Sequence, residues 1–367
     1  MKNVRHVLGI SGGKDSGALA IYMKDKYPHL EIEYYTCDTG KELDETYQLI
    51  DNLEIYLGKK IIRLKAFEGS TDAPFDHKLK TLSGFLPSQQ FRWCTKSLKL
   101  EPFEKFVASD NVISYVGIRG DEDRDGYISR KPNIQTIFPF RKNIWSEDVI
   151  AKILSNNNSK QVLNLYSIIA ATKNSNRFKE ILKQPLSINF TQVQKLNLLL
   201  GINIKEFNAL VFSFLKTTSY PLAQEEYFAL IDNDEILVRD DIFRILEESG
   251  VGVPQYYNKI DFEVNGKEGQ YSRSRSGCYF CFYQQKIEWI WLYEQHPDKF
   301  QLALEYEKEG YTWNQDETLT DLIKPERIQG IKEEYLKRFE KNSQPKSEYL
   351  LDILNEAEGE GCAACFI

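Results

Sequence analysis

The sequence predicts an α/β fold, a doubly wound parallel sheet with a helical insertion and a C-terminal helical segment. Three observations indicate this class. Short apolar strands alternate with amphipathic helices over residues 1–150, a pattern typical of a parallel sheet covered by helices. A glycine turn lies between the first strand and the first helix. From residue 151 to residue 235 the patterns are helical only, which predicts an inserted module.

The expected elements follow from hydrophobic periodicity and β-branched content. Strands are expected at residues 4–10, 31–37, 60–64 and 112–118, and helices at residues 16–27, 43–57 and 102–107. The insertion is expected to hold helices at residues 162–171, 177–182, 190–200 and 204–217. Residues 236–300 then return to the core domain through a helix at 239–249 and a cysteine-rich loop, and residues 301–367 form the C-terminal helical segment.

Composition limits the class of protein. The chain has 367 residues, of which 42% are hydrophobic and 28% charged, and its formal net charge is −7. These values predict a folded globular protein and exclude a basic coat for nucleic acid, although a local basic groove remains compatible. No apolar run approaches 18 residues, and the turn at residue 11 comes too early for a signal peptide. We therefore expect a cytoplasmic protein with no membrane segment.

Six cysteines form the next informative feature, and four of them lie in two C-x-x-C pairs. The six are Cys37, Cys94, Cys278, Cys281, Cys362 and Cys365. In a chain of this length without a secretion signal, metal or redox chemistry is favoured over disulfides. Cys37 ends a predicted strand and is expected to be a small buried residue.

The glycine turn has the context that phosphate binding requires. It comprises Ser11, Gly12, Gly13, Lys14, Asp15 and Ser16 and opens a helix. Unsatisfied N–H groups at a helix N-terminus attract anions, and glycine lets the backbone approach phosphate oxygens. The serine hydroxyls and Lys14 add donors, while Asp15 is expected to cap the helix or to help hold Mg²⁺. The spacing differs from that of a Walker A loop.

Four motifs in order resemble the phosphoadenosine phosphosulfate (PAPS) reductase-like branch of the PP-loop ATP pyrophosphatase (adenine nucleotide α-hydrolase) superfamily, which has a HUP-like fold. They are the S-G-G-K-D-S turn, Asp38-Thr39-Gly40 with Glu42, R-W-C-T at residues 92–95, and G-I-R-G-D-E with Arg124 at residues 117–124. The resemblance implies an enzyme that binds ATP and cleaves it between the α and β phosphates. It places Asp38, Thr39 and Gly40 beside the adenosine. Lys14, Asp15, Arg119 and Arg124 become the candidate catalytic residues, the arginines neutralising phosphate charge.

The loop at residues 272–282 is similar to the cysteine-rich loop of PAPS reductase-like proteins from DNA phosphorothioation (Dnd-type) and phage-defence clusters. That resemblance implies a sulfurtransferase with an iron–sulfur cluster, of the 4Fe-4S type, held by Cys94, Cys278 and Cys281. Either Cys362 or Cys365 is the fourth ligand, or one iron stays open. Zinc and redox-active thiols remain open alternatives. Neighbouring arginines are expected to lower the thiol pKa values.

The resemblance also implies partners: ATP, a cysteine desulfurase as sulfur donor, a DNA or tRNA substrate, and other subunits of a defence or modification complex. Two other functions remain open. A true PAPS reductase would reduce a sulfonucleotide, although the complete S-G-G-K-D-S turn and the C-terminal C-A-A-C tail depart from that class. A nucleotide-sensing subunit would bind ATP without turnover. The sulfur acceptor is not encoded in any motif.

Overall fold

The computed structural model describes residues 4–122, 129, 131–170 and 175–342 of the chain. The strands of its main sheet are β1 (Arg5–Gly9), β2 (Ile32–Cys37), β3 (Ile61–Leu64), β4 (Val112–Tyr115) and β5 (Ile134–Ile137). All four pairings are parallel and the order is β3-β2-β1-β4-β5. The predicted doubly wound α/β fold is thereby confirmed. β5 was not predicted.

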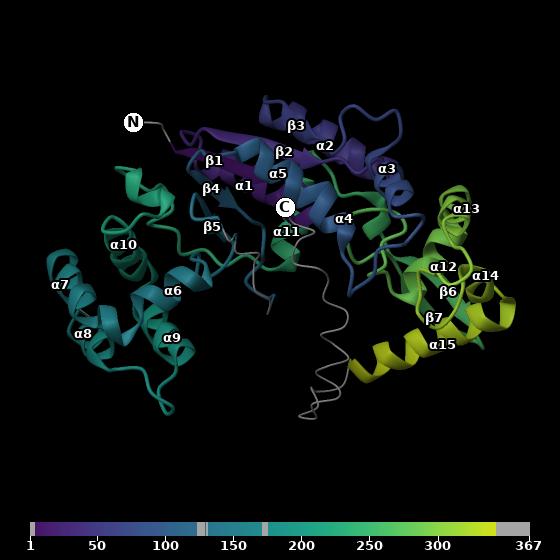
Figure 1. Cartoon of the computed structure of the whole chain (residues 1–367). Coiled ribbons are helices and arrows are strands. Elements are labelled where there is room, and N and C mark those ends of the chain that lie inside the picture. Colours follow the sequence, from purple (N-terminus) through teal and green to yellow (C-terminus); the bar gives the residue numbers. More distant parts are fainter. Residues whose placement is uncertain (1–3, 123–128, 130, 171–174, 343–367) are drawn as a thin grey trace.

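Helices cover both faces of this sheet (Figure 1), and the strands are therefore buried on both sides. On one face lie α1 (Lys14–Lys26), α2 (Asp44–Leu57) and α11 (Arg239–Glu248), and on the other lies α5 (Glu101–Val107). Neighbouring residues of β1 point to opposite faces. Leu8 therefore joins the cluster under α1, while Val7 packs with Phe103 and Val107 of α5.

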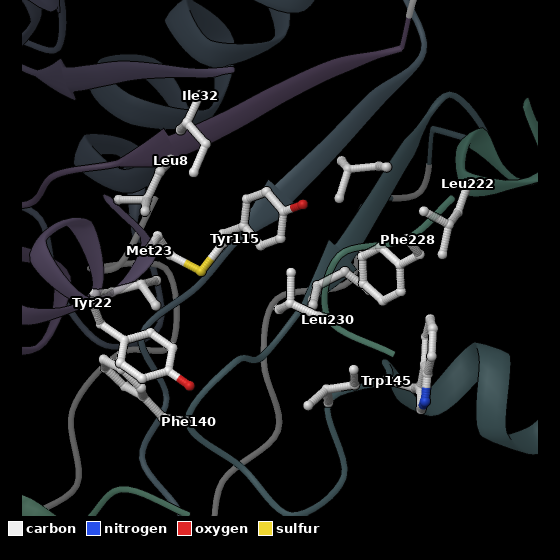
Figure 2. Packing of buried hydrophobic residues seen from close by; sticks show 14 of the residues in the cluster. Leu8, Tyr22, Met23, Ile32, Tyr115, Phe140, Trp145, Leu222, Phe228 and Leu230 are labelled. Atoms are coloured by element: carbon white, nitrogen blue, oxygen red, sulfur yellow. The ribbon is translucent and has the colours of Figure 1, made fainter. Parts of the chain in front are cut away.

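The predicted insertion is helical throughout its described part. It contains α6 (Glu147–Ile153), η2 (Asn156–Asn158), α7 (Ser159–Ile169), α8 (Ser175–Lys183), α9 (Gln192–Ile202), α10 (Ile204–Leu215) and η3 (Pro221–Gln224). Its apolar side chains share one buried cluster with the sheet. In Figure 2, Leu230 and Phe228 lie between Tyr115 of β4 and the side chains of Trp145 and Leu222. The Trp145 indole also donates to Asn208 Oδ1 at 2.9 Å, which fixes α10 against the start of α6.

A second buried cluster joins residues 253–336 to the part of the first domain between residues 43 and 98. Its later elements are η4 (Gln255–Tyr257), β6 (Ile260–Val264), β7 (Lys267–Tyr271), α12 (Lys286–Gln295), α13 (Pro297–Glu305), α14 (Leu319–Leu322) and α15 (Pro325–Asn342). Its earlier ones are α3 (Pro74–Thr81), α4 (Trp93–Thr95) and the π-helix η1 (Lys96–Leu100). Phe75 and Phe280 meet in this cluster with ring centroids 4.5 Å apart. The cysteine-rich loop is therefore packed against α3 in the N-terminal part of the chain.

The β6–β7 hairpin was not predicted, although its turn carries a recognisable signal. Asn265 and Gly266 connect the two antiparallel strands, and both have positive φ, 51° and 71°. An Asn-Gly pair with this backbone is the preferred two-residue hairpin turn.

Over the described residues, no single helix has both the length and the hydrophobicity needed to cross a membrane. α9 and α10 reach those values only when they are counted together, and they meet at 120°.

Candidate functional site

The glycine turn lies where β1 ends and α1 begins, at the carboxyl edge of the sheet. Ligands of open α/β sheets bind at this edge. Gly12 has a φ of 73°, which favours glycine, and a Cβ there would lie 2.2 Å from Thr46 Cγ2. A Cβ on Gly13 would lie 2.5 Å from Ser276 Oγ. Both glycines are therefore required by close packing around the turn.

Hydrogen bonds inside the turn use the serine hydroxyls. The Ser16 hydroxyl accepts from the Ser11 backbone N–H and donates to the Gly13 carbonyl, both at 3.1 Å. Gly13 is the N-cap of α1 and supplies no side-chain cap. Asp15 therefore does not cap the helix, and the first turn of α1 keeps the backbone character suited to an anion.

Lys14, Asp15 and Arg119 form a buried chain of charges next to the turn. Asp15 Oδ2 lies 2.8 Å from Lys14 Nζ, and Asp15 Oδ1 lies 2.8 Å from Arg119 Nη1. Arg119 also pairs with Asp121 and Glu122. Both Asp15 oxygens are thus engaged by cations. This arrangement makes Asp15 a residue that positions Lys14 and Arg119, and its role as an Mg²⁺ ligand stays a prediction.

The charges of this chain shift one another's pKa values. Burial lowers the pKa of Lys14, while Asp15 acts in the opposite direction. Burial would raise the pKa of Asp15, but the charges of Lys14 and Arg119 outweigh it and hold that pKa below its usual value. Asp15 is therefore ionised at neutral pH and holds the side chains of Lys14 and Arg119 beside the glycine turn.

The D-T-G element follows β2 at the same edge of the sheet. The Gly40 backbone N–H donates to Asp38 Oδ1 at 2.9 Å, and Gly40 has a φ of 74°. Thr39 is 1% exposed, and its hydroxyl donates to Glu42 Oε1 at 2.6 Å. Tyr47 donates to both Asp38 and Glu42 at 3.0 Å. These contacts fix a rigid polar loop beside the glycine turn.

The cysteine-rich loop lies against both of these elements. Cys278 forms an antiparallel bridge with Glu42, and the Tyr279 N–H donates to the Lys41 carbonyl at 2.9 Å. Cys278 Sγ lies 3.2 Å from Thr39 Oγ1. Ser276, two residues earlier, faces Gly13. The first C-x-x-C pair is therefore held at the nucleotide edge by direct contacts.

The three predicted ligands within the described residues are gathered in one neighbourhood. Burial raises the pKa of Cys94 to about 12, and a charge on Cys281 raises it further. Burial also raises the pKa of Cys278, with Cys281 again contributing. The pKa of Cys281 is raised by burial although Arg275, Lys99 and Arg273 act to lower it. The expectation that arginines give net thiolate character is wrong here, because desolvation dominates.

These cysteines are free thiols, and they do not form a metal-binding arrangement as placed. In the described ranges, no group of three or more His, Cys, Asp or Glu side chains has metal-ligand geometry. The donor chemistry suits iron–sulfur or zinc, but the positions do not fit either group. Cys362, Cys365 and Arg124 lie outside the described residues. Cys37 is buried, as predicted for a core residue.

Two tyrosines complete the site and were missed from the sequence. The Tyr256 hydroxyl donates to the Gly12 carbonyl at 2.9 Å. The Tyr257 hydroxyl accepts from the Lys14 backbone N–H at 3.4 Å, and its ring lies 5.2 Å from Lys14 Nζ. Burial raises the pKa of Tyr257, so its hydroxyl stays protonated. Their only local signal is the G-V-G-V-P turn that precedes them, and it does not specify a contact 244 residues away.

The sheet order and the glycine turn at its carboxyl edge define a nucleotide-binding α/β domain. Residues 5–167 match the phosphoadenosine phosphosulfate reductase domain, and this part of the chain is a domain of that family, within the PP-loop superfamily. The family consists of enzymes that act on nucleotide substrates.

An uncharacterised protein of Methanocaldococcus jannaschii is 32% identical over 153 residues. That match covers 38% of this chain and 30% of the archaeal protein, so the chain spans about a third of its relative's length. No solved structure matches the chain significantly.

Proposed function

We propose that the chain is an ATP pyrophosphatase-type enzyme that adenylates a substrate and then delivers sulfur to it. One observation carries the proposal: a C-x-x-C thiol loop touches the glycine turn through Ser276 and the D-T-G element through Cys278. The first C-x-x-C pair therefore lies directly beside the nucleotide edge. This arrangement suits a reaction in which adenylation is followed at once by attack of sulfur.

The first step is cleavage of ATP between the α and β phosphates. A substrate oxygen attacks the α phosphorus, and pyrophosphate leaves from the glycine turn. In this proposal Lys14 and Arg119 neutralise the charge of the phosphates, and the ion pairs that Asp15 makes with both side chains support it. Preorganised cations contribute most where charge develops in the transition state. Mg²⁺ enters this proposal only as the counter-ion that accompanies ATP.

The second step runs through the thiols. A persulfide on Cys278, loaded by a cysteine desulfurase, attacks the adenylated position with its outer sulfur and displaces AMP. Cys281 then attacks Cys278, releases the thiolated product and leaves a disulfide that an external dithiol reduces. The proposed acceptor is DNA or tRNA within a modification or phage-defence complex in the cytoplasm, as the family resemblance implies. No step here depends on an iron–sulfur cluster.

The test measures pyrophosphate release from ATP by the full chain. Lys14→Ala is expected to abolish release, because it removes the cation at the turn. Lys26→Ala is the matched control, since Lys26 lies on the same helix and pairs at the surface with Glu235. Unchanged release in Lys14→Ala contradicts the assignment.

Two further measurements separate the alternatives. The family match favours a sulfonucleotide reductase as the second candidate, and release of sulfite from PAPS with a dithiol would identify it. Tight ATP binding without turnover would instead identify a nucleotide-sensing subunit. Anaerobic purification with iron, sulfide and zinc analysis decides between a metal centre and the persulfide route.

A further inference from the structure

Arg273 is a buried cation among the aromatic residues of the second cluster. Its side chain is closed to solvent, with 1% of the residue exposed. The guanidinium carbon lies 5.9 Å from the centroid of the Tyr256 ring and 5.8 Å from that of the Trp291 ring, and both rings belong to this cluster. A cation at this distance from an aromatic ring is attracted to the ring face. Two aromatic residues therefore hold the guanidinium in place.

Hydrogen bonds of Arg273 connect the glycine turn to the cysteine-rich loop. The Arg273 backbone N–H donates to the Tyr256 carbonyl at 2.9 Å, just beyond the open end of the β6–β7 hairpin. The Tyr256 hydroxyl in turn donates to the Gly12 carbonyl. At the other end of the side chain, Arg273 Nη2 donates to the Cys278 carbonyl at 3.2 Å. Arg273 therefore joins the tyrosine that contacts the glycine turn to the first cysteine of the C-x-x-C pair.

The bond to Cys278 acts on the C-x-x-C turn itself. The Cys278 carbonyl also accepts from the Cys281 N–H at 3.1 Å, so the same oxygen takes part in the turn and in the contact with Arg273. A carbonyl oxygen has two lone pairs and can accept both bonds. Arg273 thus restrains the backbone that carries both thiols of the pair.

Packing alone does not explain a cation at this position. Nε and Nη1 of Arg273 are buried and have no hydrogen-bond partner within the described residues. Burying a guanidinium with two unused donors costs free energy that an apolar side chain of similar length would not cost. The bond from Nη2 to the Cys278 carbonyl is the contact that an apolar side chain could not replace.

We propose that Arg273 is a positioning residue for sulfur transfer, an inference that rests on the function proposed above. Arg273 holds the C-x-x-C turn against the glycine turn, so that Cys278 stays beside the nucleotide edge and Cys281 stays beside Cys278. It acts through the Cys278 backbone and through Tyr256. Because its side chain is closed to solvent, Arg273 does not touch the substrate and is not itself catalytic.

The experiment measures how fast iodoacetamide alkylates each cysteine of the folded, metal-free full chain at pH 8, with peptide mass spectrometry as the readout. Arg273→Met removes the donor to Cys278 and keeps an unbranched side chain. Cys278 should then react about tenfold or more faster, because loss of a hydrogen bond from a charged group lets the turn open. Cys37 lies in the separate cluster under α5 and should stay as unreactive as in the unchanged chain. Arg273→Lys keeps a cationic donor and should restore part of the protection.

Lys332→Met is the matched control. Lys332 is also a cation over an aromatic ring of the second cluster, 5.4 Å from the Phe262 centroid, but it pairs with Glu294. Its removal should leave the reactivity of Cys278 unchanged. Unchanged reactivity in Arg273→Met overturns the inference, and so does an equal gain in Lys332→Met or no protection by Arg273→Lys. A variant that does not fold, or an equal gain at Cys37, shows a role in the whole fold and also overturns it. Alkylation needs no ATP, and pyrophosphate release is measured in parallel, so failure of the proposed function is seen separately.

Discussion

Replacing Arg119 with methionine tests the buried charge chain most directly. The change keeps an unbranched side chain of similar length and removes the guanidinium that pairs with Asp15 at 2.8 Å. The side chains of Arg119 and Asp15 are only 12% and 6% exposed. Removing one partner of a buried ion pair costs about 3–5 kcal/mol. Because Lys14 still holds the other Asp15 oxygen at 2.8 Å, we expect about 3 kcal/mol.

The loss should also depend on pH in a defined direction. The pKa of Asp15 is held below its usual value by Lys14 and Arg119. The stability that its ionised form contributes is therefore present above the unfolded pKa and is lost as pH falls through the folded pKa. Without Arg119 the folded pKa rises and the loss begins at higher pH. The difference between Arg119→Met and the unchanged chain should be greatest near pH 7 and shrink below about pH 4.

Urea unfolding at pH 7 and at pH 3.5 measures both effects. Arg177→Met is the control, because Arg177 is exposed on α8; a surface change of this kind usually costs less than about 0.5 kcal/mol. A loss below about 1 kcal/mol for Arg119→Met at pH 7 refutes the reasoning. So does a loss of equal size at both pH values.

Three further outcomes are expected. Gly13→Ala places a Cβ 2.5 Å from Ser276 Oγ and should weaken ATP binding, measured by calorimetry, about tenfold or more. Gly69→Ala is the control, because a Cβ there has nothing within 4 Å. Equal ATP affinities in the two variants would contradict the packing argument. Burial lowers the pKa of His6 to about 4, so its contribution to stability is present above pH 6.5 and is lost as pH falls towards 4. His6→Gln should flatten the unfolding free energy over that range, and an unchanged slope rejects this role. Burial raises the pKa of Cys94 to about 12. In metal-free protein at pH 8, Cys94 should therefore react with iodoacetamide about tenfold or more slowly than free cysteine does. Reaction at the rate of free cysteine would exclude a buried thiol.

Local motifs account for what the sequence could predict. The glycine turn and the D-T-G element were located because each is a short run whose residues act together on one loop. β5 (Ile134–Ile137) was missed because two of its four residues, Gln135 and Thr136, are polar, so the segment reads as neither an apolar run nor an alternating one, although all four are buried. Its identity as a strand comes from pairing with β4, a contact between segments more than 20 residues apart.

The chemistry of the site was less predictable than its location. Arg119 was expected to neutralise phosphate charge, but no motif indicated that Asp15 and two neighbouring carboxylates hold its side chain. The thiols of Cys94 and Cys281 were expected to be acidic, and burial reverses that shift. Desolvation depends on what packs around a group in three dimensions, and no spacing in the sequence reports it.

The hydroxyl of Tyr256 on the Gly12 carbonyl has a consequence for how the protein is made. These two residues are 244 positions apart, so a growing chain exposes its nucleotide turn long before the tyrosine is synthesised. Closing a loop of that length carries an entropic cost that only the finished cluster around α12 can offset. Nascent or prematurely terminated chains that lack Tyr256 therefore carry an incomplete glycine turn.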